Sequence, residues 1–432
     1  MGTTVFARRA LLLVPAIVVT VSSVPVLADV QALSLSQVVE SSLRNNGELK
    51  ALREEQGIRD AGKARAGLLP NPTLDLEAGT SALTGSSSEN SLALGVSQEF
   101  PLAGKRDKRI SIAERELEIF RWQVADRERL LRDEVKSAFY DALLAKERVA
   151  LAGSFIALNR QLLDVTRERL AAGDIPELEM NLVKVELARS EGARFEAAKA
   201  MMQGQAKLWT LMGLTPGNQQ AIAGTLESDT RMTRSLADLK QLAQANRPDL
   251  KALEAESGRA EADMLLAEAE SVPNLTTGLV FRRDTTSMEI NGAEGKDTAY
   301  TIGVRLSMPI PVFDRNQAGI QEARARKTSS ESRLATATRI VEQEVESAYA
   351  SIQQAASMLS LYKGDIIPQL EENLKLTQEA YRLGEVGILA VIQEQKKFFE
   401  VNDGYLTALH DRQTALVKLE SVIASELTGG EK

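Results

Sequence analysis

Histidine and cysteine are the residues that would most directly indicate catalysis or tight metal binding, and this chain has almost none. It contains one histidine, His410, and no cysteine among 432 residues. Tight transition-metal sites use clusters of imidazole and thiolate ligands, and a single histidine provides no such cluster. The ten methionines are scattered, and no nucleophile, base and orienting group occur in a recognisable arrangement. We therefore predict that the chain is not an enzyme and that it holds no cofactor or metal ion of its own.

The elements that could position functional residues begin after an N-terminal segment typical of exported proteins. Two arginines precede an apolar run at 10–27, which ends in the small-residue pattern that signal peptidase cleaves. We interpret residues 1–28 as a signal peptide. An uncleaved membrane anchor is the alternative, although the run contains Pro15 and Pro25 and is short for spanning hydrocarbon. Because cysteine is absent, a lipoprotein form is not expected.

The overall charge and hydropathy restrict the possible partners. The chain carries a formal net charge of −8, which argues against a nucleic-acid partner. Beyond the N-terminal segment, no stretch offers the roughly twenty apolar residues of a transmembrane helix. The exported chain is therefore expected either to remain in the periplasm or to cross a membrane as β-strands.

An internal duplication organises the rest of the sequence. Four segments recur in the same order, and the offset grows from 201 to 211 residues: 45–52 as 246–253, 70–71 as 273–274, 134–138 as 344–348, and 173–175 as 384–386. We predict two repeats of common architecture, residues 29–225 and 226–432.

Each repeat contains two segments in which apolar residues alternate with small or polar ones. The predicted strands are about 72–84, 90–100, 274–284 and 298–310. Such two-faced segments are typical of transmembrane β-barrels, and equally of a half-buried soluble sheet. If the apolar side faces lipid, the charged residues that face the barrel lumen are Asp75, Glu77, Arg282 and Arg305.

The helical segments favour the barrel interpretation. Residues 103–172 and 314–383 each predict a helix of about 105 Å, far longer than helices of globular domains. Both carry heptad seams, and Pro368 predicts a kink in the second. Shorter helices at 35–66 and 174–212 match the first long helix in length, which indicates an antiparallel helical wall. Four strands cannot close a barrel, so several copies of the chain would have to contribute strands.

At this point the chain resembles the TolC family of outer-membrane efflux proteins. The resemblance covers nearly the whole exported chain and rests on the repeated segment at 45–49, the strand pairs, the duplication, and the turn at 367–369 followed by 381–384. Segments 98–106 and 173–179 look most like the CzcC/CnrC-like heavy-metal efflux branch.

The resemblance implies a homotrimer, with a twelve-stranded β-barrel in the outer membrane of a Gram-negative bacterium and a long α-helical barrel in the periplasm. It also implies a periplasmic adaptor and an inner-membrane transporter of the resistance-nodulation-division type as partners. The expected cargo is heavy-metal cations of the cobalt, zinc, cadmium, nickel or copper and silver type. A multidrug or type I secretion channel is the alternative, and a periplasmic coiled-coil adaptor or scaffold is a more remote one.

Two helical hairpin turns, at 169–179 and 381–389, would then form the periplasmic tip. The residues expected to dock the adaptor are Arg169, Gly173, Asp174, Arg382, Gly384 and Glu385. In relatives, acidic residues just past the tip narrow the pore entrance, and Glu177 and Glu179 hold that position in the first repeat. Ala390 and Gln393 stand at the corresponding place in the second. Two alternatives remain open. The two segments could be ordinary turns with no docking role, and Glu177 and Glu179 could be solvated surface residues.

Overall fold

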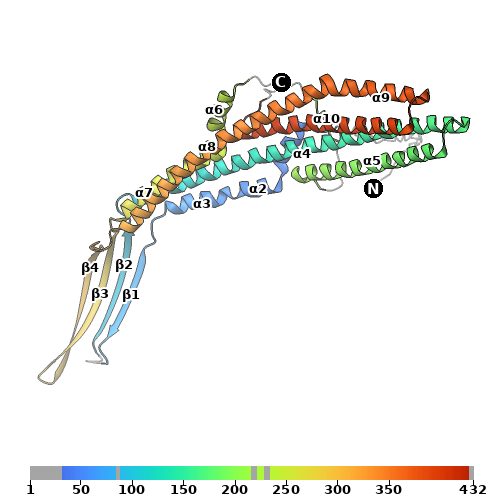
Figure 1. Cartoon of the computed structure of the whole chain (residues 1–432). Coiled ribbons are helices and arrows are strands. Elements are labelled where there is room, and N and C mark those ends of the chain that lie inside the picture. The colour runs from blue at the N-terminus through green and yellow to red at the C-terminus, as the bar shows by residue number, and fades with distance from the viewer. Residues whose placement is uncertain (1–31, 84–87, 216–220, 228–233, 428–432) are drawn as a thin grey trace, which may run out of the picture.

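The computed structural model describes residues 32–83, 88–215, 221–227 and 234–427, so the predicted signal peptide lies outside the described residues. The molecule is elongated, with a sheet at one end and long helices extending from it (Figure 1). The first half contains α1 (Leu35–Asn45), α2 (Gly47–Glu54), α3 (Gln56–Ala66), β1 (Thr73–Thr80), β2 (Asn90–Phe100), α4 (Lys105–Ala172) and α5 (Glu177–Leu211).

The second half repeats this element order with small differences. It contains α6 (Leu236–Asn246), α7 (Pro248–Glu270), β3 (Leu275–Ile290), β4 (Ala293–Ser307), α8 (Gln317–Leu361), a π-helical turn (Tyr362–Ile366), α9 (Ile367–Arg382) and α10 (Ile388–Ile423). Of the helices in the described ranges, none has both the length and the apolar character needed to cross a membrane.

The four strands form one antiparallel sheet in the order β1-β2-β3-β4. The central β2–β3 pairing joins the two halves of the chain. The second hairpin is longer than predicted, because β3 continues past residue 284 to a two-residue turn at Asn291 and Gly292. Both turn residues have positive φ, 55° and 81°, as the tight turns that suit twisted hairpins require.

The helical part is built on α4, a 68-residue helix of about 100 Å. It packs against α5 on one side and α10 on the other, with α3 and α7 near the sheet. Both predicted heptad seams lie in the packed interior, except that Val149 at the end of the first is only half-buried. The fully or nearly fully buried positions are Leu131, Val135, Ala138 and Ala142 on α4, and Val341, Val345, Ala348, Ile352, Ala355 and Leu359 on α8.

The predicted second long helix, 314–383, is interrupted just before Pro368. Proline has no amide hydrogen, so the carbonyl one turn earlier loses its helical partner. The chain accommodates this with the π-helical turn Tyr362–Ile366. Gly404 of α10 packs against that turn so closely that a Cβ there would lie 2.5 Å from the Tyr362 hydroxyl. The irregularity predicted at Pro368 is therefore a π-helical turn, and Gly404 of α10 packs against it.

The shorter predicted helix at 35–66 is divided into α1, α2 and α3. Asn46 ends α1 and caps α2, since its side-chain oxygen accepts a hydrogen bond from the Leu49 amide at 3.1 Å. Its side-chain nitrogen donates to the Leu211 carbonyl at the end of α5, 3.1 Å away. Asn46 therefore joins helices end to end, and Arg247 stands at the corresponding position of the second repeat.

Candidate functional site

The sheet has one apolar face, formed by cross-strand rows of aliphatic and aromatic side chains. One row contains Leu74, Val96, Leu279 and Val304, and the next contains Leu76, Leu94, Phe281 and Ile302. These side chains are largely exposed, and Ile302 reaches 79 %. Such an exposed continuous apolar surface marks contact with a membrane or another protein.

The opposite face is polar and brings together the four charged residues predicted to share a face. Arg305 lies in the row of Ser97 and Gly278, and Asp75 lies in the row of Gly95, Val280 and Gly303. Between the charged side chains the rows contain mainly glycine, alanine, serine and threonine. This face can therefore border water while its small residues leave space beside the sheet.

Glu77 and Arg282 lie in one row of the polar face, separated by Ala93. Asp284, two residues beyond Arg282, belongs to the same face, and the sequence interpretation did not include it. The period of two could have identified Asp284, because alternate residues of a strand share a face. The polar face thus carries three carboxylates and two guanidinium groups among these five residues.

Toward the β3–β4 turn, charged residues such as Arg283 and Lys296 depart from this division. Arg283 lies on the apolar face, directly opposite Tyr300 of β4. The Tyr300 ring stacks on Phe281 with a centroid distance of 6.0 Å. Arginine and tyrosine both combine an apolar stem with a polar end, so this pair suits the border between an apolar and an aqueous medium.

At the far end of the helices, the two hairpin turns have the same backbone geometry. Gly173 and Gly384 end α4 and α9 in the left-handed region, with φ of 82° and 79°. After each, the next residue donates its amide back over the turn: Asp174 to the Arg169 carbonyl, and Glu385 to the Ala380 carbonyl. This is the Schellman motif, for which glycine is favoured because it has no Cβ.

A contact between the two tips depends on Tyr381, which is only 1 % exposed. Arg169 donates a hydrogen bond to the Tyr381 carbonyl at 2.7 Å, and its guanidinium carbon lies 4.7 Å from the ring centroid. The Tyr381 hydroxyl donates to Glu179 Oε2 at 3.3 Å. Burial raises the pKa of Tyr381. Arg169 and Glu179 thus hold the two tips together through one tyrosine, a link that the sequence interpretation missed.

The other predicted tip residues are solvent-exposed. They are Gly173, Asp174, Glu177, Arg382, Gly384 and Glu385. Arg382 makes only a 3.6 Å ion pair with Glu379, one turn away on the same helix. These side chains are free to meet a partner, whereas Arg169 and Glu179 already have contacts inside the tip.

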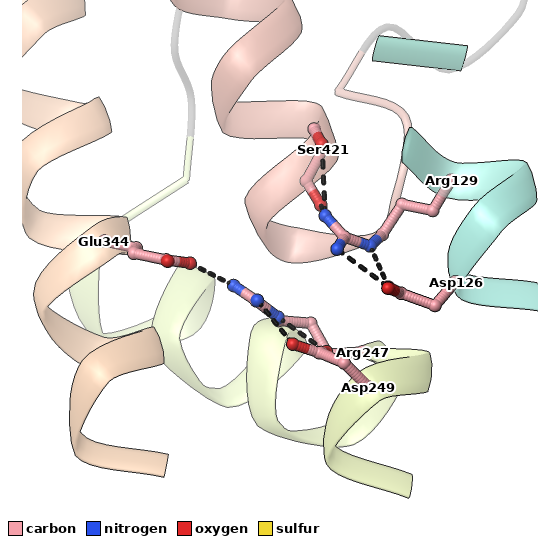
Figure 2. A network of polar contacts seen from close by, with 6 residues as sticks. All are labelled: Asp126, Arg129, Arg247, Asp249, Glu344 and Ser421. Carbon is pink, nitrogen blue, oxygen red and sulfur yellow. Dashed lines mark hydrogen bonds and ion pairs between the residues drawn. The ribbon is translucent and has the colours of Figure 1, made fainter. Parts of the chain in front are cut away.

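Near the centre of the molecule, two groups of polar contacts hold helices together (Figure 2). Buried Arg247, in the repeated segment before α7, forms ion pairs with Asp249 and with Glu344 of α8. Burial would lower the pKa of Arg247, but its hydrogen bonds to both carboxylates more than offset this and raise it. The group therefore remains a cation that holds α7 against α8.

A second arginine in Figure 2 fixes the end of α10. Arg129 of α4 pairs with Asp126 at 2.7 Å and donates to the carbonyl oxygen of Ser421 at 2.9 Å. Carbonyls of the last helical turn have no partner within the helix, so a guanidinium satisfies one of them. This pairing could not be predicted from the sequence, because the two residues are far apart along the chain.

The single histidine also joins helices. Nε2 of His410 on α10 lies 2.9 Å from Oδ1 of Asp141 on α4. The hydrogen bond with Asp141 is the main cause that raises the pKa of His410, and it lowers the pKa of Asp141 in turn. Within the described ranges, no group of three or more His, Cys, Asp or Glu side chains is arranged to hold a metal ion.

Sequence comparison identifies a protein family and several relatives that this chain resembles. The family model described as outer membrane efflux protein matches residues 38–214 and 239–425. The cobalt-zinc-cadmium resistance protein CzcC of Cupriavidus metallidurans is 25 % identical over 392 residues, covering 90 % of each chain. The pyoverdine export outer membrane protein OpmQ of Pseudomonas putida is 24 % identical, covering 85 % of this chain and 81 % of OpmQ.

Among solved structures, a crystal structure of CusC superposes with a TM-score of 0.75 at 18 % identity. The match covers 90 % of this chain and 92 % of that one. This likeness concerns the fold. Since the family model matches both halves and most of the chain, the protein belongs to the outer membrane efflux protein family.

Proposed function

We propose that this protein is the outer-membrane channel subunit of a tripartite efflux system that passively conducts heavy-metal cations out of the cell. The observation that carries the proposal is the two-faced sheet in a member of this family. In a barrel, its apolar rows would contact lipid, and Asp75, Glu77, Arg282 and Arg305 would line the lumen together with Asp284.

The channel would be a homotrimer. Among the described residues, β1 and β4 each pair on one side only, which leaves two open edges. Lipid does not tolerate unpaired backbone groups, so the edges would be closed by strands of further copies. Three chains of four strands would supply the twelve strands that the family resemblance implies.

The helical end would extend into the periplasm and meet the adaptor, which connects it to an inner-membrane transporter of the resistance-nodulation-division type. Exposed Asp174, Arg382 and Glu385 would make the docking contacts, with Gly173 and Gly384 shaping the two turns. We propose that Arg169 holds the two tips in position for docking, because its guanidinium group is already in contact with Tyr381.

Glu177 and Glu179 would form an acidic pore entrance in the trimer. Glu177 is exposed, whereas Glu179 accepts the Tyr381 hydrogen bond and keeps its charge near the tip. Three copies of each carboxylate around an axis would concentrate cations there. Replacing both by glutamine and recording ion selectivity in planar bilayers tests this assignment; unchanged selectivity would remove it.

The similarity to CzcC, a cobalt-zinc-cadmium resistance protein, supports metal cations as cargo, because the match covers nine-tenths of both chains. The similarity to OpmQ supports an organic small molecule as the second candidate, at nearly the same identity but with lower coverage. A water-filled conduit would serve either cargo, and the inner-membrane partner would make the choice.

Growth tests with a deletion strain separate the two cargoes. We expect the strain to become sensitive to one or more of zinc, cobalt, cadmium, nickel, copper and silver, and the intact gene to restore tolerance. A panel of dyes, antibiotics and chelating siderophores runs in parallel. Sensitivity confined to the organic compounds would contradict the metal proposal and leave the channel architecture standing.

A further inference from the structure

The apolar face of the sheet ends in basic residues on the side away from the helices. On β3 the apolar rows run from Leu275 to Arg283, a length of about 27 Å along the strand. With strand tilt included, this length spans most of the apolar band of outer-membrane barrels, which is about 25 Å tall. Figure 1 shows that the β3–β4 turn is the end of the sheet farthest from the helices. Arg283 and its partner Tyr300 therefore stand where the apolar rows end on that side.

A second basic residue follows on the same face. Lys296 lies opposite Ser287, two rows beyond Arg283 and about 14 Å from it along the strands. Both basic residues are exposed, and within the described ranges neither side chain makes a hydrogen bond or an ion pair. On this face of the described strands, basic residues occur only at this end. The apolar face thus has one positively charged border.

The row between the two basic residues offers neutral hydrogen-bonding groups. It contains Thr80, Asn90, Thr285 and Thr298. The hydroxyl oxygens of Thr285 and Thr298 lie 3.3 Å apart. A group bound above this row would be about 7 Å along the strands from either basic row, within reach of a long arginine or lysine side chain. One anion could therefore contact two cations and several neutral donors.

Carboxylates near this border lie at the level of Lys296 and beyond it. Glu89 accepts a hydrogen bond at 3.4 Å from the hydroxyl of the serine opposite Lys296. The row nearest the turn pairs Glu289 with Glu294. An anion at this border would therefore be held mainly by Arg283, and Lys296 would close its outer side.

We infer that this border binds a phosphate group of a phosphorylated glycolipid in the outer leaflet of the membrane. A guanidinium group binds two phosphate oxygens at once, and an exposed arginine at the end of an apolar surface can reach a lipid headgroup. The stacked rings of Tyr300 and Phe281 would lie against the acyl chains just below it.

The position of the border selects this lipid over a phospholipid. The inference rests on the proposed outer-membrane channel, in which the helices extend into the periplasm and the β3–β4 turn points outward. Phosphorylated glycolipids form most of the outer leaflet of a Gram-negative outer membrane, whereas phospholipids form the periplasmic leaflet. Arg283 and Lys296 lie on the outward side, so the phosphate they meet belongs to the glycolipid.

Lipid binding to the unmodified full-length protein tests the site without any substitution. The protein is purified from outer membranes in detergent and mixed with lipid A, an acylated and phosphorylated glucosamine disaccharide, and bound lipid is measured by native mass spectrometry. Lipid A should bind at least about ten-fold more tightly than lipid A without its phosphates, because charge-assisted hydrogen bonds are lost. Inorganic phosphate should not displace it, because the acyl chains are also held.

Three results of this measurement would overturn the inference. Equal binding of the two forms of lipid A would mean that apolar contact alone holds the lipid. Equal binding of phosphatidylglycerol would mean that any anionic lipid suffices. Displacement by inorganic phosphate would mean a site for a free anion.

Matched substitutions locate the site on one face of the sheet. Arg283→Ala combined with Lys296→Ala should weaken lipid A binding about ten-fold, and Arg283→Lys should retain most of it. Arg282→Ala removes the neighbouring arginine of the polar face, and this control should bind lipid A as the unmodified protein does. An equal loss in the control, or no loss in the double variant, would overturn the assigned residues.

Failure of this site and failure of the proposed function give different results. A protein that inserts into outer membranes and restores metal tolerance, yet binds both forms of lipid A alike, would overturn this inference alone. A protein that is absent from outer membranes would contradict the proposed function and, with it, the site.

Discussion

The helical layer buries many of its apolar side chains, whereas the sheet exposes its apolar side chains on one face. In the helical layer, Val345 and Leu143 are completely buried, whereas in the sheet Ile302 and Leu306 are mostly exposed. The two regions belong to one chain of ordinary apolar content. The difference teaches that the helical layer is organised for water on its outside, and the sheet for an apolar medium on one face and water on the other.

The largest expected effect comes from removing apolar volume in the two regions. Leu143→Ala should lower the free energy of unfolding by about 3 kcal/mol, because it leaves a cavity in a closely packed seam. Leu306→Ala, the same substitution on the exposed sheet face, should change it by less than ~0.5 kcal/mol in detergent. Helical circular dichroism during denaturant unfolding measures both. Equal losses would mean that the sheet face is packed like the helical interior.

Placing a charge on either face of the sheet sharpens the comparison further. Val304→Lys should disfavour membrane insertion by about 2–4 kcal/mol, whereas Thr301→Lys on the polar face should be tolerated. The readout is the fraction of protein recovered from outer membranes in folded form. If Thr301→Lys were the more harmful of the two, the assignment of the faces would be reversed.

Polar groups inside the helical layer provide an intermediate effect. Gln395 is fully buried on α10, and both polar atoms of its side chain have no hydrogen-bond partner among the described protein groups. Gln395→Met keeps the shape and removes the unpaired amide, so thermal stability should rise by the equivalent of about 1–2 kcal/mol. A lower melting temperature would show that the amide has a partner that matters. Gln393→Met, at the exposed neighbouring position on the helix, is the control for added apolar surface.

The smallest expected effect is a pH dependence at His410. Its folded pKa is raised mainly by the hydrogen bond with Asp141, so its contribution is complete below the ordinary histidine pKa and is lost as pH rises through the folded value. The lowered pKa of Asp141 acts in the other direction, and its contribution is lost as pH falls through that value.

Since Asp141 is partly exposed, the pair should contribute no more than about 1 kcal/mol. Melting temperatures between about pH 6 and pH 9 should fall more for the unmodified protein than for His410→Gln. Parallel curves for the two proteins would exclude a contribution from this pair over that interval.

Much of this architecture could be predicted from the sequence, because periodicity is local. The alternation in β4 placed Arg305 opposite the apolar residues, and the heptads on α4 and α8 placed Val135 and Val345 in the packed interior. Apolar residues recur at every second position in the strands and at helical spacing in the helical layer, and each spacing can be recognised within a single segment. The Asn291-Gly292 pair could also have indicated the longer second hairpin, since this dipeptide favours a two-residue turn.

The contacts between distant segments could not be predicted in the same way. Nothing near Arg169 in the sequence indicates that Tyr381 will lie under its guanidinium, and nothing near Arg247 identifies Glu344 as its partner. The first contact depends on how the two halves are placed against each other, and the second depends on how the start of α7 packs on α8 within the second half. The repeat showed that residue 247 occupies a recurrent joint, but a repeat relates positions to their copies and not to their neighbours in space.

The central β2–β3 ladder also determines when the sheet can exist. Residue 100 of β2 pairs with residue 275 of β3 and residue 90 with residue 285, so β2 must wait until synthesis has passed residue 285 in the second half. Until then the first hairpin presents an unpaired edge and an apolar face together, the combination most prone to aggregation. A chain that stopped after α5 would keep that edge permanently open. Formation of the sheet is thus tied to the synthesis of β3, and in the proposed exported channel chaperones of the compartment would be needed most during that interval.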